Sequence, residues 1–226
     1  MSATSGGSGI SYWHWRIVPL VCLALLVAVL PAFGGDLTLE PSGTRTHTTA
    51  EWVSETNEQS TEANEVLYLE KRIEDPFVGA VVAVKGLDGA APSEIRNLSW
   101  DRREDSICNA SEPRWGIGIE GLSGTPHVVY LGCLEAEHEP STDDHWVRDE
   151  FSAEMIQRAV RSVGGADAVQ GQVRAVAILF TQEPTERPAV AYIDNVQVNE
   201  VIWRQRESEN TARPTLSRMT GIDRVW

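Results

Sequence analysis

The feature of this 226-residue chain that most constrains its fold is an alternation of apolar and polar residues between residues 66 and 203. A period of two is typical of β-strands with one buried face, and about eight short runs show it. Turn residues such as Asp88-Gly89 and Ser123-Gly124 separate the runs. Many short strands divided by such turns favour antiparallel over parallel pairing. The sequence therefore predicts an all-β fold, an antiparallel β-sandwich of the jelly-roll type.

One stretch within this region has the spacing of a helix instead. Ser152 suits the N-cap position, and Gly164-Gly165 suits the end of a helix. Between them, apolar residues recur at the spacing of a single helix face, namely Ile156, Ala159, Val160 and Val163. The sequence predicts a short amphipathic helix that covers an edge or an open end of the sandwich.

The amino-terminal part of the chain carries an apolar run, residues 17–33. As a helix this run would span about 25 Å, slightly less than the bilayer core of about 30 Å. Arg16 precedes it and acidic residues follow, which predicts a cytoplasmic amino terminus and an extracytoplasmic remainder. Residues 1–34 are interpreted either as a signal peptide cleaved after the break at Pro31, or as a retained signal anchor flanked by the aromatic residues of "YWHW". The protein is then secreted or membrane-anchored.

Differences in amino-acid composition and periodicity divide residues 35–226 into three segments. Residues 35–65 are rich in Thr, Ser and Glu and predict a solvated linker, with a loosely attached strand near Trp52 as the alternative. Residues 66–203 form the predicted sandwich domain, and residues 204–226 lack periodicity and predict a flexible tail. The net charge of −14 argues against a nucleic-acid-binding surface, which needs Lys and Arg to neutralise phosphates.

Two cysteines, Cys108 and Cys133, lie outside the apolar run. In an oxidising compartment an even number of cysteines predicts a disulfide, and two buried free thiols are the alternative. The chain-entropy model gives such a bridge a stabilising effect of about 3.5 kcal/mol. Neither cysteine has a C-x-x-C partner, so no zinc site is predicted.

The stretch YIDNVQV at 192–198 resembles the final strand of jelly-roll modules in the galactose-binding-like group, which includes many carbohydrate-binding modules. The resemblance implies that Asp194 helps to bind a structural Ca²⁺, with Glu70, Glu74 or Asp75 as partners. Ca²⁺ takes about six to eight oxygen ligands, which carboxylates and carbonyls at strand ends supply. Asp194 facing solvent, or bound to an arginine or to backbone N–H groups, is the alternative. No other cofactor is predicted.

Sugar binding needs flat apolar faces beside groups that hydrogen-bond hydroxyls. Core packing is the alternative for every tryptophan, and we expect Trp115 and Trp203 to be buried because they alternate with strand neighbours. The predicted ligand-binding residues are two tryptophans with nearby acids: Trp100, Asp101, Trp146 and Asp144. These residues predict a non-catalytic, extracytoplasmic binding module, with a polysaccharide or cell-surface glycan as its partner.

Two other functions remain open on the sequence. One is a structural or adhesion protein of the cell envelope with a protein partner. The other is a glycoside hydrolase-like enzyme, in which Glu135 and Glu137 would have to face one cleft as an acid pair. The sequence contains no G-x-S-x-G motif, no P-loop and no dinucleotide-binding motif. The histidines of residues 133–146 lack H-E-x-x-H spacing, so no catalytic metal is predicted.

Overall fold

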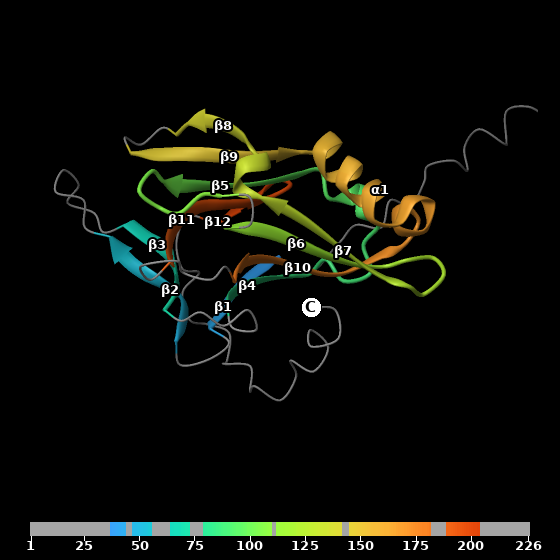
Figure 1. Cartoon of the computed structure of the whole chain (residues 1–226), viewed down its shortest axis with the longest axis horizontal. Helices are drawn as coiled ribbons and strands as arrows, with labels where there is room; N and C mark the ends of the chain where they lie inside the picture. The colour runs from blue at the N-terminus through green and yellow to red at the C-terminus, as the bar shows by residue number, and fades with distance from the viewer. Residues whose placement is uncertain are drawn as a thin grey trace, which may run out of the picture. The chain divides into compact units, whose positions relative to one another are not determined.

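Two antiparallel β-sheets and one α-helix make up the described part of a computed structural model (Figure 1). The predicted all-β sandwich is therefore confirmed. In the described ranges no helix is long and apolar enough to cross a membrane. The predicted membrane segment at 17–33, the rest of 1–34 and the predicted tail at 204–226 lie outside these ranges. The described residues are 37–43, 47–55, 64–72, 79–109, 112–141, 145–181 and 189–203.

The first sheet has five strands, and each neighbouring pair is antiparallel. The central strand, β10, is buried along most of its length. It lies between β4 and β6, and its apolar residues pack in the core. In spatial order the strands are β1 (Thr38–Gly43), β4 (Ala80–Lys85), β10 (Gln172–Phe180), β6 (Arg114–Glu120) and β7 (Pro126–Gly132).

The second sheet has seven strands and is also antiparallel. Its outermost strand β8 is four residues long, and each of these residues is exposed. A β-bulge interrupts β11 between Asp194 and Gln197, where Asn195 has a φ of 45°. The strands in order are β2 (Thr48–Glu55), β3 (Asn64–Lys71), β11 (Ala189–Val198), β5 (Asn97–Arg103), β9 (Trp146–Ser152) and β8 (Glu137–Pro140), and β12 (Val201–Trp203) also pairs with β11.

The core lies between the inner faces of the two sheets. Trp100 of β5 and Trp115 of β6 are fully buried, and their rings stack with centroids 5.3 Å apart. Phe151 of β9 meets the Trp100 ring edge-on at 5.5 Å. Trp115 and Trp203 are buried, as predicted. Large aromatic rings therefore fill the space between the sheets beside the expected Val, Ile and Leu side chains.

Residues 38–43 and 48–55 form strands of the sandwich, which differs from the linker predicted for 35–65 and agrees with its alternative, a strand near Trp52. β1 pairs with β4 in one sheet and β2 pairs with β3 in the other. Leu39 and Trp52 are among the partly buried side chains that pack against the core. Apolar residues on one face are enough to hold these strands, although Thr, Ser and Glu dominate their average composition. The linker prediction is therefore wrong for β1 and β2.

Helix α1 (Ala153–Val169) follows β9 and contacts β7, β9 and the short 3₁₀ helix η1 (Pro92–Glu94). Its Ile156 and Val160 are buried, as the predicted apolar face requires, whereas Val163 is exposed. The predicted end at Gly164-Gly165 coincides with a break in the helix rather than with its last residue. Gly165 has non-helical dihedral angles, with φ at 56°, and a further turn continues to Val169. Glycine allows this break because it has no Cβ to clash at positive φ.

The turn after Gly165 places Asp167 against the loop between β6 and β7. The Asp167 carboxylate accepts hydrogen bonds from Nε2 of His127 at 2.8 Å, and from the backbone N–H and the hydroxyl of Ser123 at 2.7 and 3.1 Å. The hydrogen bond from His127, followed by that from the Ser123 backbone, lowers the pKa of Asp167 below its ordinary value. The ionised carboxylate therefore ties the helix end to the loop.

Replacing Asp167 is expected to weaken the acid dependence of stability. A carboxyl whose pKa is lowered by folding stabilises the fold above its unfolded-state pKa of about 3.9, and this contribution is lost as pH falls through the folded-state pKa. Asp167→Asn should therefore lower the unfolding midpoint at pH 7 and leave it closer to wild type below pH 4. Glu154→Asn, at an exposed helix position, is the control. Equal pH profiles for wild type and Asp167→Asn would contradict the assignment.

Candidate functional site

A row of large side chains crosses the outer face of the seven-stranded sheet. Tyr68 of β3 lies opposite Tyr192 of β11, and Arg103 of β5 lies opposite Trp146 of β9. Ile193 pairs with Arg102, so the preceding Tyr192 lies opposite the following Arg103. All four side chains of this row are partly exposed, whereas the strand neighbours of the two tyrosines belong to the core, namely Leu67, Leu69, Ala191 and Ile193. We call these four residues, Tyr68, Tyr192, Arg103 and Trp146, the cross-strand row.

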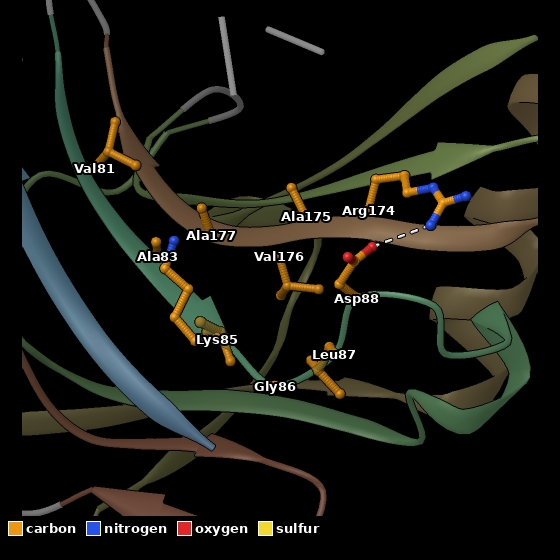
Figure 2. A pocket seen from close by; sticks show the side chains of 11 residues that line it. Val81, Ala83, Lys85, Gly86, Leu87, Asp88, Arg174, Ala175, Val176 and Ala177 are labelled. Atoms are coloured by element: carbon orange, nitrogen blue, oxygen red, sulfur yellow. Dashed lines mark hydrogen bonds and ion pairs between the residues drawn. The ribbon is translucent and has the colours of Figure 1, made fainter. Parts of the chain in front are cut away.

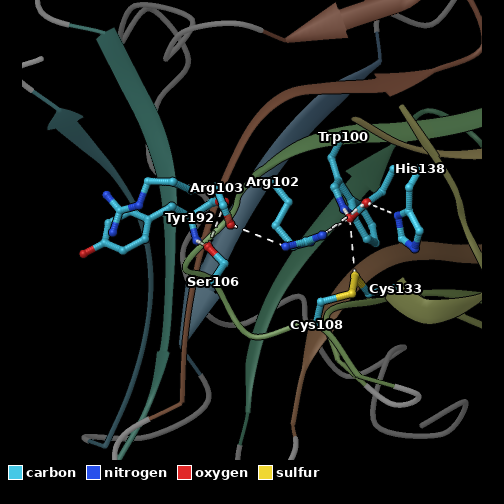
Figure 3. A network of polar contacts seen from close by, with 9 residues as sticks. Trp100, Arg102, Arg103, Ser106, Cys108, Cys133, His138 and Tyr192 are labelled. Carbon is cyan, nitrogen blue, oxygen red and sulfur yellow. Dashed lines mark hydrogen bonds and ion pairs between the residues drawn. A yellow bond between two sulfur atoms is a disulfide. The ribbon is translucent and has the colours of Figure 1, made fainter. Parts of the chain in front are cut away.

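Three members of the cross-strand row contact one another directly, and Trp146 is the backbone pairing partner of Arg103. The rings of Tyr68 and Tyr192 lie 5.2 Å apart and are tilted by 49°. The guanidinium carbon of Arg103 lies 3.5 Å from the centre of the Tyr192 ring (Figure 3). The Tyr192 backbone N–H donates to the hydroxyl of Ser106 at 2.9 Å, which fixes the strand against the turn after β5. Tyr68, Tyr192 and Arg103 therefore form a continuous surface of aromatic and planar groups.

The phenol of Tyr68 stays protonated throughout the physiological range. Burial raises the pKa of Tyr68 to about 12, and the negative charge of Glu70 adds to the shift. Glu70 in turn pairs with Arg72, with 2.7 Å between Oε2 and Nη2. A hydrogen bond between the Tyr68 hydroxyl and the Glu70 carboxylate also contributes to the raised pKa, so this hydroxyl donates to Glu70.

A connected set of polar side chains lies beside the row on the same face. Asp101 of β5 is its centre and is only 5% exposed. Its Oδ1 accepts a hydrogen bond from Arg148 at 3.0 Å. Its Oδ2 accepts from the hydroxyl of Ser141 at 3.0 Å and from the side-chain amide of Asn195 at 2.7 Å. The bulge in β11, with Asn195 at positive φ, is what brings this amide toward Asp101.

Arg148 extends this set across three strands. Its Nη2 donates to the Ser99 hydroxyl at 2.7 Å and to Oε1 of Gln197 at 2.5 Å. The side-chain amide of Gln197 donates to the Asn199 carbonyl at 2.6 Å. We call Asp101, Arg148, Ser99, Gln197, Asn195 and Ser141 the Asp101 network. Because each member is held by another, the network presents carboxylate, amide and guanidinium groups in fixed positions.

The structure does not bring Asp194 and Glu70 together as ligands of one ion. Glu70 pairs with Val190, four residues along β11 from Asp194, which corresponds to about 13 Å of strand. Oxygen ligands of one Ca²⁺ must each lie about 2.4 Å from the ion, so the two cannot share it. Asp194 is 5% exposed, and its Oδ1 accepts the Asn195 backbone N–H at 2.7 Å. This spacing does not favour Asp194 and Glu70 as ligands of one ion, and the predicted Ca²⁺ stays a prediction.

The other predicted calcium partners, Glu74 and Asp75, lie outside the described residues. Within the part of the chain that the structure describes, no group of three or more His, Cys, Asp or Glu residues is placed to hold a metal ion. The hydrogen bond that Asp194 accepts from a backbone N–H is one of the alternatives that the sequence left open for this acid.

A second polar cluster lies on the inner side of the same sheet and is centred on Asp149 (Figure 3). Asp149 is fully buried and accepts hydrogen bonds from Nε1 of Trp100 at 2.8 Å and from Nε of Arg102 at 2.9 Å. Nδ1 of His138 also contacts this carboxylate at 2.8 Å. The three donors come from β5 and β8, so Asp149 links three neighbouring strands at the rim of the core.

Trp100 is therefore a core residue, and its prediction as a surface for stacking sugars is wrong. Its ring is fully buried against Trp115 and its indole N–H is bound by Asp149. The charged residues that follow it in the sequence suggested a loop, but they continue the strand and alternate between the two faces. Asp101 faces outward and Arg102 turns inward to Asp149.

The other three predicted ligand residues are Asp101, Trp146 and Asp144. Asp101 and Trp146 lie on the outer face of the seven-stranded sheet, within the Asp101 network and the cross-strand row, and their role in binding stays a prediction. Asp144 lies outside the described residues. Sequence reasoning missed Tyr192 and Arg103. The signal was available in the alternation itself, since each lies two residues from an outward-facing acid, Asp194 or Asp101.

The predicted disulfide is present. Cys108 and Cys133 are bonded, with Cα atoms 5.5 Å apart. Cys133 begins the 3₁₀ helix η2 (Cys133–Glu135) and is fully buried, and its Sγ lies 3.4 Å from Oδ2 of Asp149. A disulfide sulfur carries no proton, so this last contact is not a hydrogen bond. The bridge joins η2 to the segment after β5.

A pocket lies on the other sheet, between the ends of β4 and β10 (Figure 2). Its volume is about 260 Å³, and alanines 83, 175 and 177 are among its lining residues. Asp88 is the one carboxylate among the residues that line it, and it pairs with Arg174 at 3.2 Å. Glu135 and Glu137 are elsewhere, since Glu135 accepts the Gly132 backbone N–H and Glu137 lies on β8. This pocket therefore lacks the acid pair that a glycosidase needs.

Comparisons with known proteins concern the fold. No protein-family profile matches this sequence, and no curated protein matches it either. Among solved structures, the chain is similar to a family 30 carbohydrate-binding module, with 11% identity, a TM-score of 0.41, and coverage of 75% of this chain and 81% of that chain. It is also similar to an exo-β-agarase, with 11% identity and a TM-score of 0.33, over 73% of this chain and 23% of that chain.

Proposed function

We propose that this protein is a non-catalytic, extracytoplasmic binding module that binds a neutral glycan on the outer face of its seven-stranded sheet. The observation that carries the proposal is the position of the cross-strand row directly beside the Asp101 network. Sugar rings stack their apolar faces on aromatic side chains, and their hydroxyls exchange hydrogen bonds with carboxylate, amide and guanidinium groups. Both kinds of group lie together on this face.

Charge supports a neutral glycan over an acidic one. The arginines of this face are already paired with carboxylates, Arg148 with Asp101 at 3.0 Å and Arg103 with Asp105 at 2.6 Å. An anionic polysaccharide would have to break these pairs and approach a chain of net charge −14. A neutral glycan does not have to break these ion pairs and is not repelled by the negative charge of the protein.

The extracytoplasmic location is supported by the disulfide between Cys108 and Cys133, because such bonds persist in oxidising compartments. The apolar run at 17–33 supports the same location as a sequence-based prediction. Whether this run remains as an anchor or is removed does not change the binding proposal.

Retention of the full chain on neutral polysaccharides tests this function. In affinity electrophoresis with a soluble β-glucan, xylan and galactan, at least one should retard wild type, while the acidic polymers alginate and polygalacturonate should not. Tyr192→Ala should weaken retention about five-fold, because stacking on an aromatic ring contributes roughly 1 kcal/mol beyond its buried area.

The matched control for Tyr192→Ala is Tyr130→Ala. Tyr130 is 45% exposed on the other sheet and also lies under an arginine, with 4.2 Å between its ring centre and the guanidinium carbon of Arg114. This variant should bind like wild type. If no polysaccharide retards the chain, or if both variants bind equally, glycan binding at this face is refuted and the adhesion hypothesis gains ground.

A further inference from the structure

The two ends of the cross-strand row lie far apart on the outer face of the seven-stranded sheet. Tyr68 is on β3 and Trp146 is on β9, and strands β11 and β5 lie between them. Neighbouring strands are about 4.8 Å apart, so three spacings separate the two ends by about 14 Å. Both side chains are partly exposed. The row is therefore longer than the ring of one sugar.

The polar side chains beside the row are aligned in the same direction. Asp101 of β5 pairs with Arg148 of β9 on one side and with Asp194 of β11 on the other. Each of the three lies two residues along its strand from a member of the row, which places it on the same face. Two residues correspond to about 7 Å along a strand. The face thus carries a strip about 14 Å long across the strands and about 7 Å wide along them.

The shape of this strip limits how a ligand can use it. A chain lying along one strand would meet a single member of the row, because successive members are on different strands. A single sugar unit would contact at most two members, since these are about 5 Å apart. Only a linear ligand that lies across the strands reaches both Tyr68 and Trp146, with one edge beside the Asp101 network. The repeat of a linear pyranose chain is close to one strand spacing, so about three linked units cover the distance.

We propose that Tyr68 and Trp146 are the two end contacts of one elongated subsite, so that this face selects linear neutral glycans of about three or more sugar units. The inference rests on the proposed function of this face. It makes chain length the property that the face recognises. Monosaccharides should bind poorly, because a short ligand makes fewer contacts while much of the entropic cost of association remains.

Titration calorimetry of the full-length protein with oligosaccharides of one to six units tests the length dependence. The oligosaccharides are prepared from whichever of the β-glucan, xylan and galactan retards the wild type. Affinity should rise about 25-fold from the monosaccharide to the tetrasaccharide, the product of two further aromatic contacts of about five-fold each. It should change less than about two-fold from the tetrasaccharide to the hexasaccharide, because further units extend past the row.

Variants at the two ends of the row test whether one chain contacts both. Tyr68→Ala and Trp146→Ala should each weaken hexasaccharide binding about five-fold. Each should change disaccharide binding less than about two-fold, because a disaccharide can use the remaining positions of the row. Tyr68→Phe and Trp146→Phe keep a ring and should bind the hexasaccharide like wild type, as should the control Tyr130→Ala on the other sheet.

Two results would overturn the elongated subsite while glycan binding itself stands. One is a monosaccharide that binds as tightly as the hexasaccharide. The other is a loss of hexasaccharide affinity in only one of the two end variants, or in neither. In each case Tyr192→Ala would still weaken retention on the polysaccharide. Failure of every polysaccharide to retard the wild type would instead refute the proposed function, and the end contacts with it.

Discussion

Replacing Asp149 with alanine is expected to cost about 3–5 kcal/mol of folding free energy, the range for removing one partner of a buried ion pair. Asp149 is fully buried and the side chain of Arg102 is 8% exposed, so the arginine would be left with an uncompensated charge inside the protein. Trp100 would also lose the acceptor for its indole N–H in the middle of the core. Both consequences add to the loss of the pair itself.

Urea denaturation monitored by tryptophan fluorescence measures this effect, since Trp100 and Trp115 are core residues. Glu200→Ala is the matched control, because Glu200 pairs with Arg96 at 2.7 Å but both side chains are mostly exposed. We expect the control to lose less than about 1 kcal/mol. A loss of similar size in the two variants would show that Asp149 is not the buried centre described above.

Removing the disulfide is expected to lower the free energy of unfolding by about 3.5 kcal/mol in the chain-entropy model. The bridge spans a sequence separation of 25 residues, so its absence frees a long segment of the unfolded chain. The double variant Cys108→Ala/Cys133→Ala tests this without leaving a free thiol. Because Cys133 is fully buried beside Asp149, the removed sulfur atoms also leave a small packing defect.

Dithiothreitol provides the control for this second prediction. It should shift the unfolding midpoint of wild type toward that of the double variant and leave the double variant unchanged. Peptide mass analysis without reductant should recover Cys108 joined to Cys133. A midpoint of the double variant equal to that of oxidised wild type would contradict a stabilising bridge.

Local patterns in the sequence predicted those features that depend on neighbouring residues. The period of two identified the strands, and the paired cysteines identified the disulfide. Trp100 shows how the same pattern was misused. Trp100 lies two residues from Leu98 and two from Arg102, so all three share the inner face of the strand. The acids and arginines around Trp100 were nevertheless interpreted as a loop. The alternation was the better guide, because a strand pairs its backbone regardless of the charge of its outward side chains.

Averaged composition failed where a few positions decide the structure. In residues 38–55, Thr, Ser and Glu suggested a solvated segment, yet Leu39 and Trp52 are spaced to share the core face of their sheets. A strand needs only alternate residues to be apolar, so its mean composition is a poor indicator of its burial.

Contacts between distant residues could not be predicted from the sequence. Trp100 and Asp149 are 49 positions apart and meet because β5 and β9 are adjacent in the sheet. The Asn195 amide reaches Asp101 because of a bulge that strict alternation does not anticipate. Asp194 and Asn195 of β11 thus both make polar contacts, Asp194 with a backbone N–H and Asn195 with Asp101.

The short outer strand β8 has a consequence for association between molecules. Its four residues are Glu137, His138, Glu139 and Pro140, and all are exposed. A molecule that tried to extend the sheet by adding a strand here would meet two negative charges and a proline without an N–H to donate. Addition of a strand from a second copy at the β8 edge is therefore unfavourable.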